Sequence, residues 1–296
     1  MVIEISSDSR IDINHHFRVS AGPGAGKTHW LSLHVSHVLK DSESLGKMGK
    51  VACLSYTNVG ADTLMGRMYE DRSRVLSCTI HSFLYAYIVK PYLHFIATDE
   101  GFNIELLNGE DDRILSDYNT FEEIRKAVKQ YYAEQDATFT AIRAAKWKLQ
   151  EDGSLKCYAN PPKKCCKKGY ALNENAYVVY KKLAWKKGYM HYDDVLYFSY
   201  KLIQKYPFIS RTLAIQFPYV FIDEFQDTNP IQAKIIKSLG ENGAIVGVIG
   251  DYAQSIYGFL GADPNQFASF TLDGLLDYTI CLLYTSPSPR DRTRSR

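Results

Sequence analysis

The sequence lacks any run of about 18 consecutive apolar residues, so it predicts no membrane-spanning helix. Its first ten residues include Glu4 and Asp8 and no apolar core, so we expect no secretory signal peptide there. The six cysteines show no paired spacing, which excludes a disulfide framework and favours reduced thiols in a cytoplasmic protein. They are Cys53, Cys78, Cys157, Cys165, Cys166 and Cys281.

A strong excess of one charge is also absent, since the formal net charge is +2 over 296 residues. Four arginines and one aspartate within residues 281–296 account for this excess. Any basic character that serves nucleic-acid binding must therefore be local, and the overall charge indicates nothing about such a partner. The 46% hydrophobic and 23% charged residues are typical of a globular protein with one or two domains.

Short apolar segments alternate with helical patterns in both the first third and the last third of the chain. This alternation predicts an α/β fold with a parallel sheet covered on both faces. The expected strands are Val2–Ile5 at an edge, Phe17–Ala21, Val51–Tyr56, Val75–Thr79, Tyr219–Asp223 and Ala244–Gly250. Residues from about 95 to 190 lack such strands and predict an all-α insertion. Its expected helices are 121–150, with a break near 138–140, and 176–185, and a further helix over 193–206 follows the insertion.

The stretch Val19–Thr28 passes from an apolar strand through a glycine-rich turn into a helix. Glycines let backbone N–H groups approach phosphate oxygens, and the helix N-terminus adds partial positive charge. We expect Lys27 to reach the β- and γ-phosphates and Thr28 to offer its hydroxyl to Mg2+. Ala21 replaces the usual first glycine, and a chance glycine turn is the alternative. The predicted nucleotide-binding residues are Gly22, Pro23, Gly24, Ala25, Gly26, Lys27 and Thr28.

A second chemical signal is the pair of acids that ends the strand Tyr219–Asp223. At the carboxyl edge of a parallel sheet, Asp223 would lie near the phosphate loop and bind Mg2+, directly or through water. Glu224 would orient and deprotonate the attacking water, because attack on a γ-phosphate needs a positioned nucleophile. Alternatively, these acids only open a turn and cap the helix after Asn229.

Together these stretches resemble the UvrD/Rep-type superfamily 1 DNA helicases. Asp223–Thr228 is similar to the family's Walker B motif, and four further stretches agree in order and spacing. They are Ala21–Thr28 for motif I, which tolerates the leading alanine, Tyr56–Met65 for motif Ia, Thr79–Phe83 for motif Ib and Val248–Phe259 for motif III. Tyr192–Leu196 also looks like the family's short acidic motif before Walker B. The resemblance implies a RecA-like P-loop NTPase domain that carries a helical insertion.

The resemblance further implies ATP with Mg2+ as cofactors and single-stranded DNA or a 3′-tailed duplex as partner, with movement 3′ to 5′. Gln254 would contact the γ-phosphate, because an amide both donates and accepts hydrogen bonds; otherwise it is a surface amide. The DNA-facing residues would be Thr57, Asn58, His81, Phe83, Tyr257 and Phe259. For Phe83 and Phe259, packing in the core is the alternative.

Two departures from the family pattern weaken parts of this interpretation. Leu260 stands where the family usually has an arginine, which removes a cation near the junction of DNA and ATP. Residues 1–20 contain no glutamine that could read adenine, so ATP rather than another nucleotide rests on the resemblance alone.

The expected insertion carries lysines interleaved with aromatic residues, a pattern that suits nucleic acid or, equally, a solvated helix face. The residues are Lys146, Trp147, Lys148, Lys156, Lys163, Lys164, Lys167, Lys168, Tyr170, Tyr177, Tyr180, Lys181, Lys182, Trp185, Lys186, Lys187 and Tyr189. Cys157, Cys165 and Cys166 have no second cysteine pair or nearby histidine, so we expect no zinc site.

We expect a RecA-like domain in two parts, residues 1–92 and 191–275, around an insertion over 93–190, followed by a disordered tail over 276–296. Cys281–Asp291 resembles a translated sequencing adapter, and a genuine basic tail is the alternative. The second RecA-like domain of the family would then be absent. This chain alone would bind nucleotide weakly, hydrolyse it slowly and not unwind DNA.

The sequence thus favours the ATP-binding part of a DNA helicase or translocase. The alternative is a degenerate ATP- and DNA-binding module without motor activity, the partner of a nuclease. A P-loop small-molecule kinase would give no reason for motifs Ia, Ib and III. DNA repair is one of several pathways that use such a motor.

Overall fold

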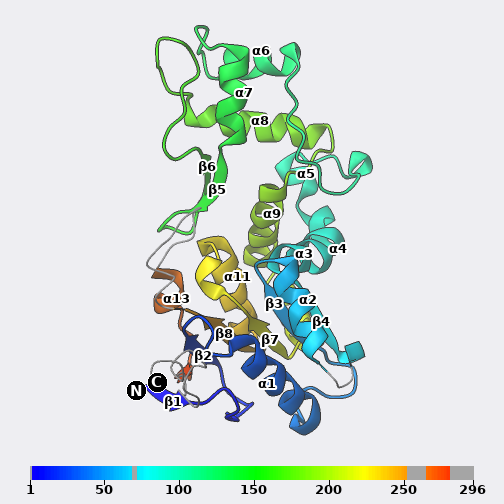
Figure 1. Ribbon diagram of the computed structural model, residues 1–296. Coiled ribbons are helices and arrows are strands. Elements are labelled where there is room, and N and C mark those ends of the chain that lie inside the picture. Colours follow the sequence, from blue (N-terminus) through cyan, green and yellow to red (C-terminus); the bar gives the residue numbers. More distant parts are fainter. Residues whose placement is uncertain (1, 69–71, 252–264, 281–296) are drawn as a thin grey trace, which may run out of the picture. The chain divides into compact units, whose positions relative to one another are not determined.

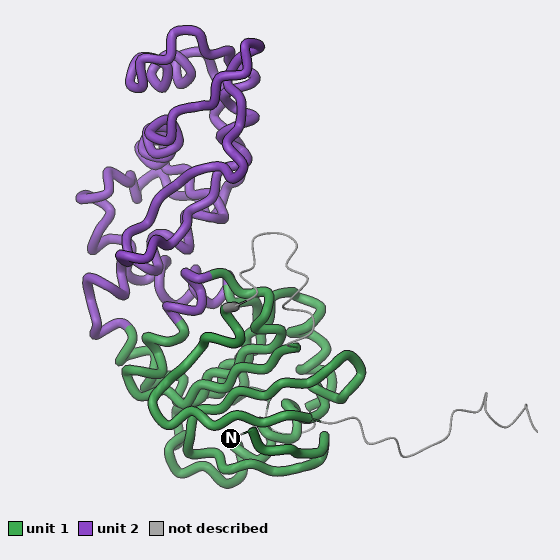
Figure 2. Tube along the Cα trace, turned by 90° about the vertical axis from the view of Figure 1, so that its left-hand side faces the viewer, with its two compact units in different colours: residues 1–80, 210–229, 236–296 green, residues 81–209, 230–235 purple. Residues whose placement is uncertain are grey.

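The computed structural model describes residues 2–68, 72–251 and 265–280 and divides into two compact units, which we describe separately (Figure 2). Unit 1 comprises Met1–Ile80, Ser210–Asn229 and Ile236–Arg296. Unit 2 comprises His81–Ile209 and Pro230–Ile235. None of the helices within the described ranges combines the length and apolarity that a bilayer crossing requires.

Unit 1 is built on a parallel sheet that has seven strands within the described residues, in the order β1-β9-β2-β8-β7-β3-β4 (Figure 1). Every neighbouring pair is parallel, which confirms the predicted α/β class. The strands are β1 (Val2–Ile5), β2 (Phe17–Ala21), β3 (Val51–Ser55), β4 (Val75–Thr79), β7 (Tyr219–Ile222), β8 (Ile245–Gly250) and β9 (Leu276–Ile280).

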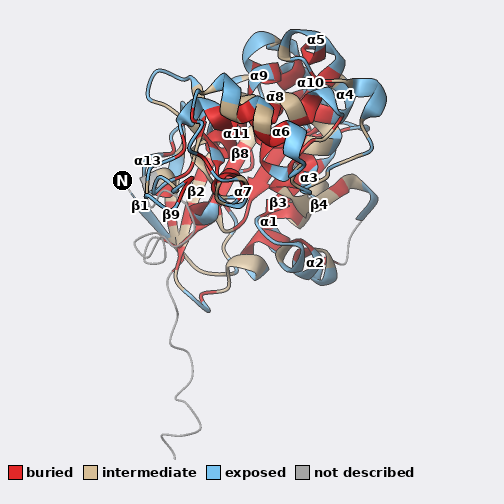
Figure 3. Ribbon diagram, turned by 90° about the horizontal axis from the view of Figure 1, so that it is seen from above, coloured by how far each residue is buried: buried red, intermediate tan, exposed pale blue. Residues whose placement is uncertain are grey.

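The helices α1 (Lys27–Asp41) and α2 (Asn58–Arg67) contribute to the core on one side of this sheet. α1 buries Trp30, Leu31, Val35 and Val38, whose three- and four-residue spacing forms one apolar stripe. Alternate residues of the strands join the same core, as period-two side-chain direction requires. Those residues are Phe17, Val19 and Ala21 of β2, Val51 and Cys53 of β3, and Tyr219 and Phe221 of β7. Figure 3 shows the sheet as a buried layer.

On the other side, the part of α11 (Pro230–Glu241) that belongs to unit 1, from Ile236 on, lies close to the sheet. A Cβ at Gly240 would come within 3.2 Å of Val246 in β8, so helix and strand approach closely there. Further helical segments that lie wholly or mainly in unit 1 are η1 (Arg72–Arg74), α10 (Phe208–Gln216), η5 (Phe225–Asp227) and α13 (Asn265–Ser269).

Strand β9 corrects the predicted start of the tail at residue 276. It lies between β1 and β2 and pairs with both, and it buries Tyr278 and Ile280. Arg18 of β2 donates from Nε to Asp277 Oδ1 at 2.6 Å and from Nη1 to backbone carbonyls of α13. Residues 276–280 are therefore part of the sheet, and residues 281–296 lie outside the described ranges.

Unit 2 is mainly helical, as predicted, and adds a two-stranded antiparallel sheet of β5 (Lys146–Leu149) and β6 (Leu155–Tyr158) that the sequence analysis missed (Figure 1). The predicted break at 138–140 is wrong, because these residues lie inside α7 and the helices separate at 128–134. The helices of this unit are α3 (Ile80–Leu84), η2 (Tyr85–Val89), α4 (Lys90–Tyr92), η3 (Leu93–Phe95), α5 (Ala97–Glu100), η4 (Ile104–Leu106), α6 (Tyr118–Ala127), α7 (Gln135–Arg143), α8 (Glu174–Lys186) and α9 (Tyr192–Lys205).

The core of unit 2 holds a buried carboxylate, Asp194 at the start of α9. It accepts hydrogen bonds from the indole N–H groups of Trp147 at 2.9 Å and Trp185 at 3.0 Å, and it pairs with Lys181 at 2.7 Å. Burial raises the pKa of Asp194, but Lys181 and His191 outweigh it and hold the pKa below the usual range. Four aromatic residues of the lysine-rich tract are buried in this core, so their rings are not accessible to nucleic acid. They are Trp147, Tyr177, Tyr180 and Trp185.

Candidate functional site

Strands β2, β8 and β7 are neighbours in the sheet and run in the same direction. Their carboxyl ends therefore lie at one edge. Ala21 ends β2 and leads into the glycine-rich loop, Ile222 ends β7 just before Asp223, and Gly250 ends β8 just before Asp251. The topology thus brings together the loop and the acids that the sequence analysis assigned to one site.

The glycine-rich loop has the backbone geometry that its sequence predicts. Gly24 and Gly26 have φ angles of 73° and 90°, a region that strains residues with a Cβ. A Cβ at Gly26 would also come within 3.1 Å of Ser7. α1 begins at Lys27 with no acid in its first turn. A Cβ at Gly22 would meet no atom within 4 Å. Open space beside an uncompensated helix N-terminus suits an anion.

Lys27 and Glu224 join the two halves of the site. Lys27 Nζ donates to Glu224 Oε2 at 3.2 Å, and the side chains are 10% and 39% exposed. The same carboxylate oxygen accepts a hydrogen bond from Gln226 Nε2 at 2.7 Å. Glu224 has a φ of 53°, a left-handed conformation that costs a non-glycine residue about 1–2 kcal/mol. Such strain is common where a side chain must be aimed at a reacting group.

Asp223 is buried beneath this pair. Its Oδ1 accepts from the Glu224 backbone N–H at 3.0 Å, and its own N–H donates to Leu54 O. Burial, and then the neighbouring charge of Glu224, raise the pKa of Asp223 to about 6. A cation at this carboxylate would relieve both effects. Within the described residues no group of three or more histidines, cysteines or acids could hold a metal. Mg2+ fits this sparse set, since it is commonly held by one or two carboxylates together with substrate phosphates and water.

Two members of the site were not predicted. Gln226 Oε1 accepts the backbone N–H of Asp251 at 3.1 Å, so one amide links the Glu224 carboxylate to the end of β8. Asp251 is 2% exposed. A Cβ at Gly250 would come within 2.6 Å of the same amide oxygen, so glycine is required there. Only the tertiary structure brings Gln226 and Asp251 together, although each lies in a stretch that resembles a family motif, Asp223–Thr228 and Val248–Phe259.

The family model described as the UvrD/REP helicase N-terminal domain matches residues 7–273. This chain belongs to the UvrD/REP helicase family. It is 26% identical over 288 residues to the ATP-dependent DNA helicase srs2 of Schizosaccharomyces pombe, covering 91% of this chain and 31% of that protein. It is 24% identical over 271 residues to the ATP-dependent DNA helicase PcrA of Leuconostoc citreum, covering 89% and 34%.

A shorter match joins the chain to DNA helicase II of Haemophilus influenzae, 36% identical over 97 residues, 33% of this chain and 13% of that protein. The chain spans about a third of the length of the first two relatives. The family resemblance inferred from the motifs is therefore confirmed.

Of the residues predicted to face DNA, Thr57 and Asn58 follow β3 and are exposed at the same edge of the sheet. Thr57 Oγ1 accepts from Gly60 N–H at 3.1 Å and so caps α2. Their neighbours Tyr56 and Val59, which are not among the predicted DNA-facing residues, are 51% and 75% exposed. This UvrD/REP chain thus presents exposed hydrogen-bonding side chains at the end of β3 and the start of α2.

His81 and Phe83 lie in unit 2 and are buried. His81 Nε2 donates to Glu110 Oε2 at 2.8 Å, and its ring stacks on Tyr192 with centroids 3.4 Å apart. Phe83 is 1% exposed and packs near Tyr87, so its assignment to DNA is corrected to core packing. Gln254, Tyr257 and Phe259 lie outside the described residues.

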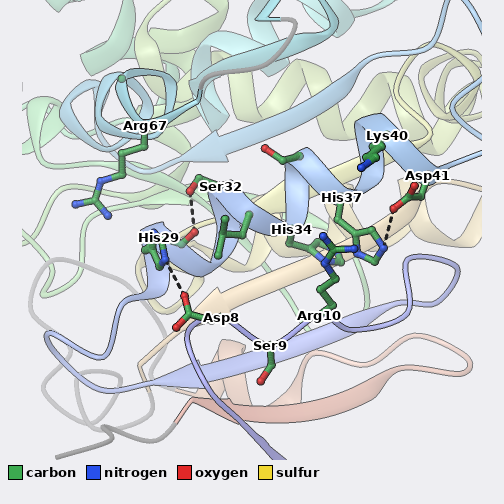
Figure 4. Close-up of a pocket in the computed structure, with 13 residues that line it drawn as sticks. Asp8, Ser9, Arg10, His29, Ser32, His34, His37, Lys40, Asp41 and Arg67 are labelled. Atoms are coloured by element: carbon green, nitrogen blue, oxygen red, sulfur yellow. Dashed lines mark hydrogen bonds and ion pairs between the residues drawn. The ribbon is translucent and has the colours of Figure 1, made fainter. Parts of the chain in front are cut away.

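A cavity of about 680 Å3 runs along the outward side of α1 (Figure 4). His29, the residue after Thr28, forms part of its wall and pairs through Nε2 with Asp8 Oδ1 at 3.1 Å. Trp30 Nε1 donates to Ser9 O at 3.0 Å, which holds the segment before β2 against the helix. None of the loop residues Gly22–Thr28 lines this cavity, which reaches the phosphate loop no nearer than His29.

Proposed function

We propose that unit 1 binds and hydrolyses ATP with Mg2+, as the N-terminal part of an ATP-dependent DNA helicase or translocase that moves 3′ to 5′ along single-stranded DNA. The observation that carries this proposal is the contact between Lys27 and Glu224 at 3.2 Å, with buried Asp223 beside them. A cation, a base and a metal-binding carboxylate are thereby gathered at the N-terminus of α1, as γ-phosphate hydrolysis requires.

Each residue of the site is proposed to have its own role in binding or hydrolysing the nucleotide. Backbone N–H groups of Gly22–Thr28 hold the phosphates, and Lys27 exchanges its bond to Glu224 for phosphate oxygens. Glu224, released from the lysine and still bonded to Gln226, orients and deprotonates water. Thr28 and Asp223 hold Mg2+, which neutralises phosphate charge when bound. Gln254, outside the described residues, is proposed to contact the γ-phosphate.

DNA contact is proposed at the exposed start of α2 that follows β3, through Thr57 and Asn58. Tyr257 and Phe259 join this proposal from the segment outside the described residues. His81 of unit 2, which is 5% exposed, is proposed as a separate DNA contact. Single-stranded DNA or a 3′-tailed duplex is the proposed partner, in the cytoplasm, with DNA repair as one setting.

A second candidate is a degenerate ATP- and DNA-binding module that serves a nuclease without motor activity. Leu260 in place of the family's arginine favours it, because that change removes a cation where coupling is expected. The acids and the lysine gathered at the sheet edge favour the motor, since a binding module needs no base.

The test is ATP hydrolysis with and without single-stranded DNA, on this chain and on a protein of the relatives' length that contains it. DNA-stimulated hydrolysis that Lys27→Ala abolishes would support the motor. Lys47→Ala, which removes an exposed lysine elsewhere in unit 1, is the matched control and should change nothing. Hydrolysis that is indifferent to DNA would favour the second candidate.

A further inference from the structure

Two tyrosines of unit 2, Tyr132 and Tyr170, are exposed side by side, and a third exposed tyrosine, Tyr131, precedes Tyr132 in the chain and has the Arg125 guanidinium 5.9 Å from its ring centroid. Tyr131, Tyr132 and Tyr170 are 62%, 49% and 55% exposed, and the ring centroids of Tyr132 and Tyr170 are 5.2 Å apart. They come from the turn 128–134 between α6 and α7 and from the loop 163–172 before α8. Grouped exposed aromatic rings are unusual on a protein surface and mark interaction sites.

Hydrogen bonds fix these two segments to each other. The buried Gln130 side chain donates to Ala171 O at 3.0 Å and to the Tyr132 hydroxyl at 3.0 Å, and it accepts from Asn173 N–H at 2.9 Å. The Glu134 N–H donates to Cys165 O at 2.8 Å. The backbone that carries the rings is therefore held in place by hydrogen bonds. Less conformational entropy is lost when a ligand packs on the rings.

The same two segments carry exposed lysines. These are Lys129, Lys164, Lys167 and Lys168, and among the described residues no salt bridge engages any of them. Glu134 is the one acid within 128–134 and 163–172, and its Oε1 accepts the backbone N–H of Lys167 at 3.2 Å. Lys129 has a φ of 56°, a conformation in which glycine is favoured, yet a lysine stands there.

We propose that Tyr131, Tyr132 and Tyr170, with these four lysines, form a binding surface for single-stranded nucleic acid. Bases stack on the tyrosine rings while the lysines face the phosphates, the combination that binds single strands without sequence preference. The excess of positive charge favours a polyanion as the ligand. The exposed rings favour a polyanion with unpaired bases that can stack on them. An acidic protein segment or a closed duplex does not offer such bases. This surface is separate from the proposed ATP site.

The experiment measures binding of a fluorescein-labelled thymidine oligonucleotide of about 16 residues to the chain by anisotropy. Tyr132→Ala with Tyr170→Ala should weaken binding by about 10- to 100-fold. Tyr118→Ala is the matched control, because Tyr118 is 62% exposed in α6 and contacts Phe121 instead of the proposed surface. Its affinity should stay within about twofold of the unmodified chain.

The lysines are tested through the dependence of affinity on salt. Replacing Lys164, Lys167 and Lys168 by glutamine should lower the slope of log affinity against log salt by about 2, since each phosphate contact contributes about 0.7 for single strands. Lys186→Gln, an exposed lysine of α8 outside the surface, should leave the slope unchanged. Lys129→Gly removes a charge where glycine is the favoured residue, so it should weaken binding without lowering the thermal midpoint.

Each measurement is repeated on chains that also carry Asn58→Ala. This substitution removes a proposed DNA contact of unit 1, so that the contribution of unit 2 is measured. Tyr132→Phe with Tyr170→Phe should restore affinity, because stacking needs the ring and not the hydroxyl. An alanine double variant that binds like the unmodified chain, or a loss equal to that of Tyr118→Ala, would overturn the proposal. Equal affinity for a duplex of the same length would also overturn it. The chain with Lys27→Ala should bind the oligonucleotide normally, so failure of the ATP site is distinguishable.

Discussion

Asp223→Asn should stabilise the protein while it removes hydrolysis. Burial and the charge of Glu224 raise the pKa of Asp223 to about 6, from 3.8 in an unstructured chain. At neutral pH the ionised carboxylate is therefore less favourable in the folded state than in the unfolded state. A shift of about two units corresponds to about 3 kcal/mol, an upper figure for the gain in free energy of unfolding. Asparagine keeps an oxygen that can accept the Glu224 N–H bond.

The sign of this effect depends on pH in a defined way. Below pH 3.8 the Asp223 carboxyl is protonated in both the folded and the unfolded state, so it does not change the free energy of unfolding. Because the pKa is higher in the folded state, the carboxyl lowers the free energy of unfolding as pH rises through 6. The advantage of Asp223→Asn should be about 3 kcal/mol at pH 8 and about half of that at pH 5. Urea denaturation of both proteins without nucleotide or Mg2+ at these two pH values measures it. Asp62→Asn, an exposed acid of α2, should change stability by less than about 0.5 kcal/mol.

Saturating Mg2+ and ATP should reverse the order, because a ligand that binds only the folded state stabilises it and the asparagine variant binds Mg2+ poorly. An asparagine variant that is less stable than the unmodified chain at pH 8, or a difference that is the same at pH 5 and pH 8, would refute the reasoning.

Three further predictions concern packing in the sheet, the buried ion pair of unit 2 and the proposed catalytic base. Gly247→Ala should cost at least about 1–3 kcal/mol in thermal unfolding, because the new Cβ would lie 2.1 Å from Phe17 Cζ; an unchanged melting midpoint would contradict the packing described. Lys181→Met should cost about 3–5 kcal/mol in urea denaturation, since it leaves Asp194 buried without its ammonium partner; a loss below 1 kcal/mol would show that the indole donors suffice. Glu224→Gln should lower hydrolysis by about 100-fold or more yet keep nucleotide affinity, which a turnover assay beside a binding titration can check.

Local patterns predicted the parts of the molecule that local chemistry determines. Uninterrupted apolar runs such as Val51–Ser55 become fully buried parallel strands, and β7 ends at Ile222, one residue before the predicted end at Asp223. Gly24 and Gly26 of the phosphate loop have the backbone angles that only glycine adopts easily. Because parallel strands end at one edge, the meeting of Lys27 with Glu224 followed from the order of the elements.

Contacts between residues far apart in the sequence determine the features that local patterns did not predict. β5 contains two lysines in four residues and does not look like a strand, but its Trp147 is held by Asp194 from α9. Strand β9 depends on pairing with β1 and β2 from the opposite end of the chain. Phe83 belongs to the core for a similar reason, since burial depends on which elements surround a residue.

The most direct test of the central claim is calorimetric titration of the chain with ATP in the presence of Mg2+, beside Lys27→Ala and Lys47→Ala. We predict saturable binding at one site, retained in Lys47→Ala and at least about tenfold weaker in Lys27→Ala, because Lys27 is the cation at the phosphate loop. Equal affinity of the unmodified chain and Lys27→Ala, or no binding by the unmodified chain at millimolar ATP, would contradict the assignment of this sheet edge as the nucleotide site.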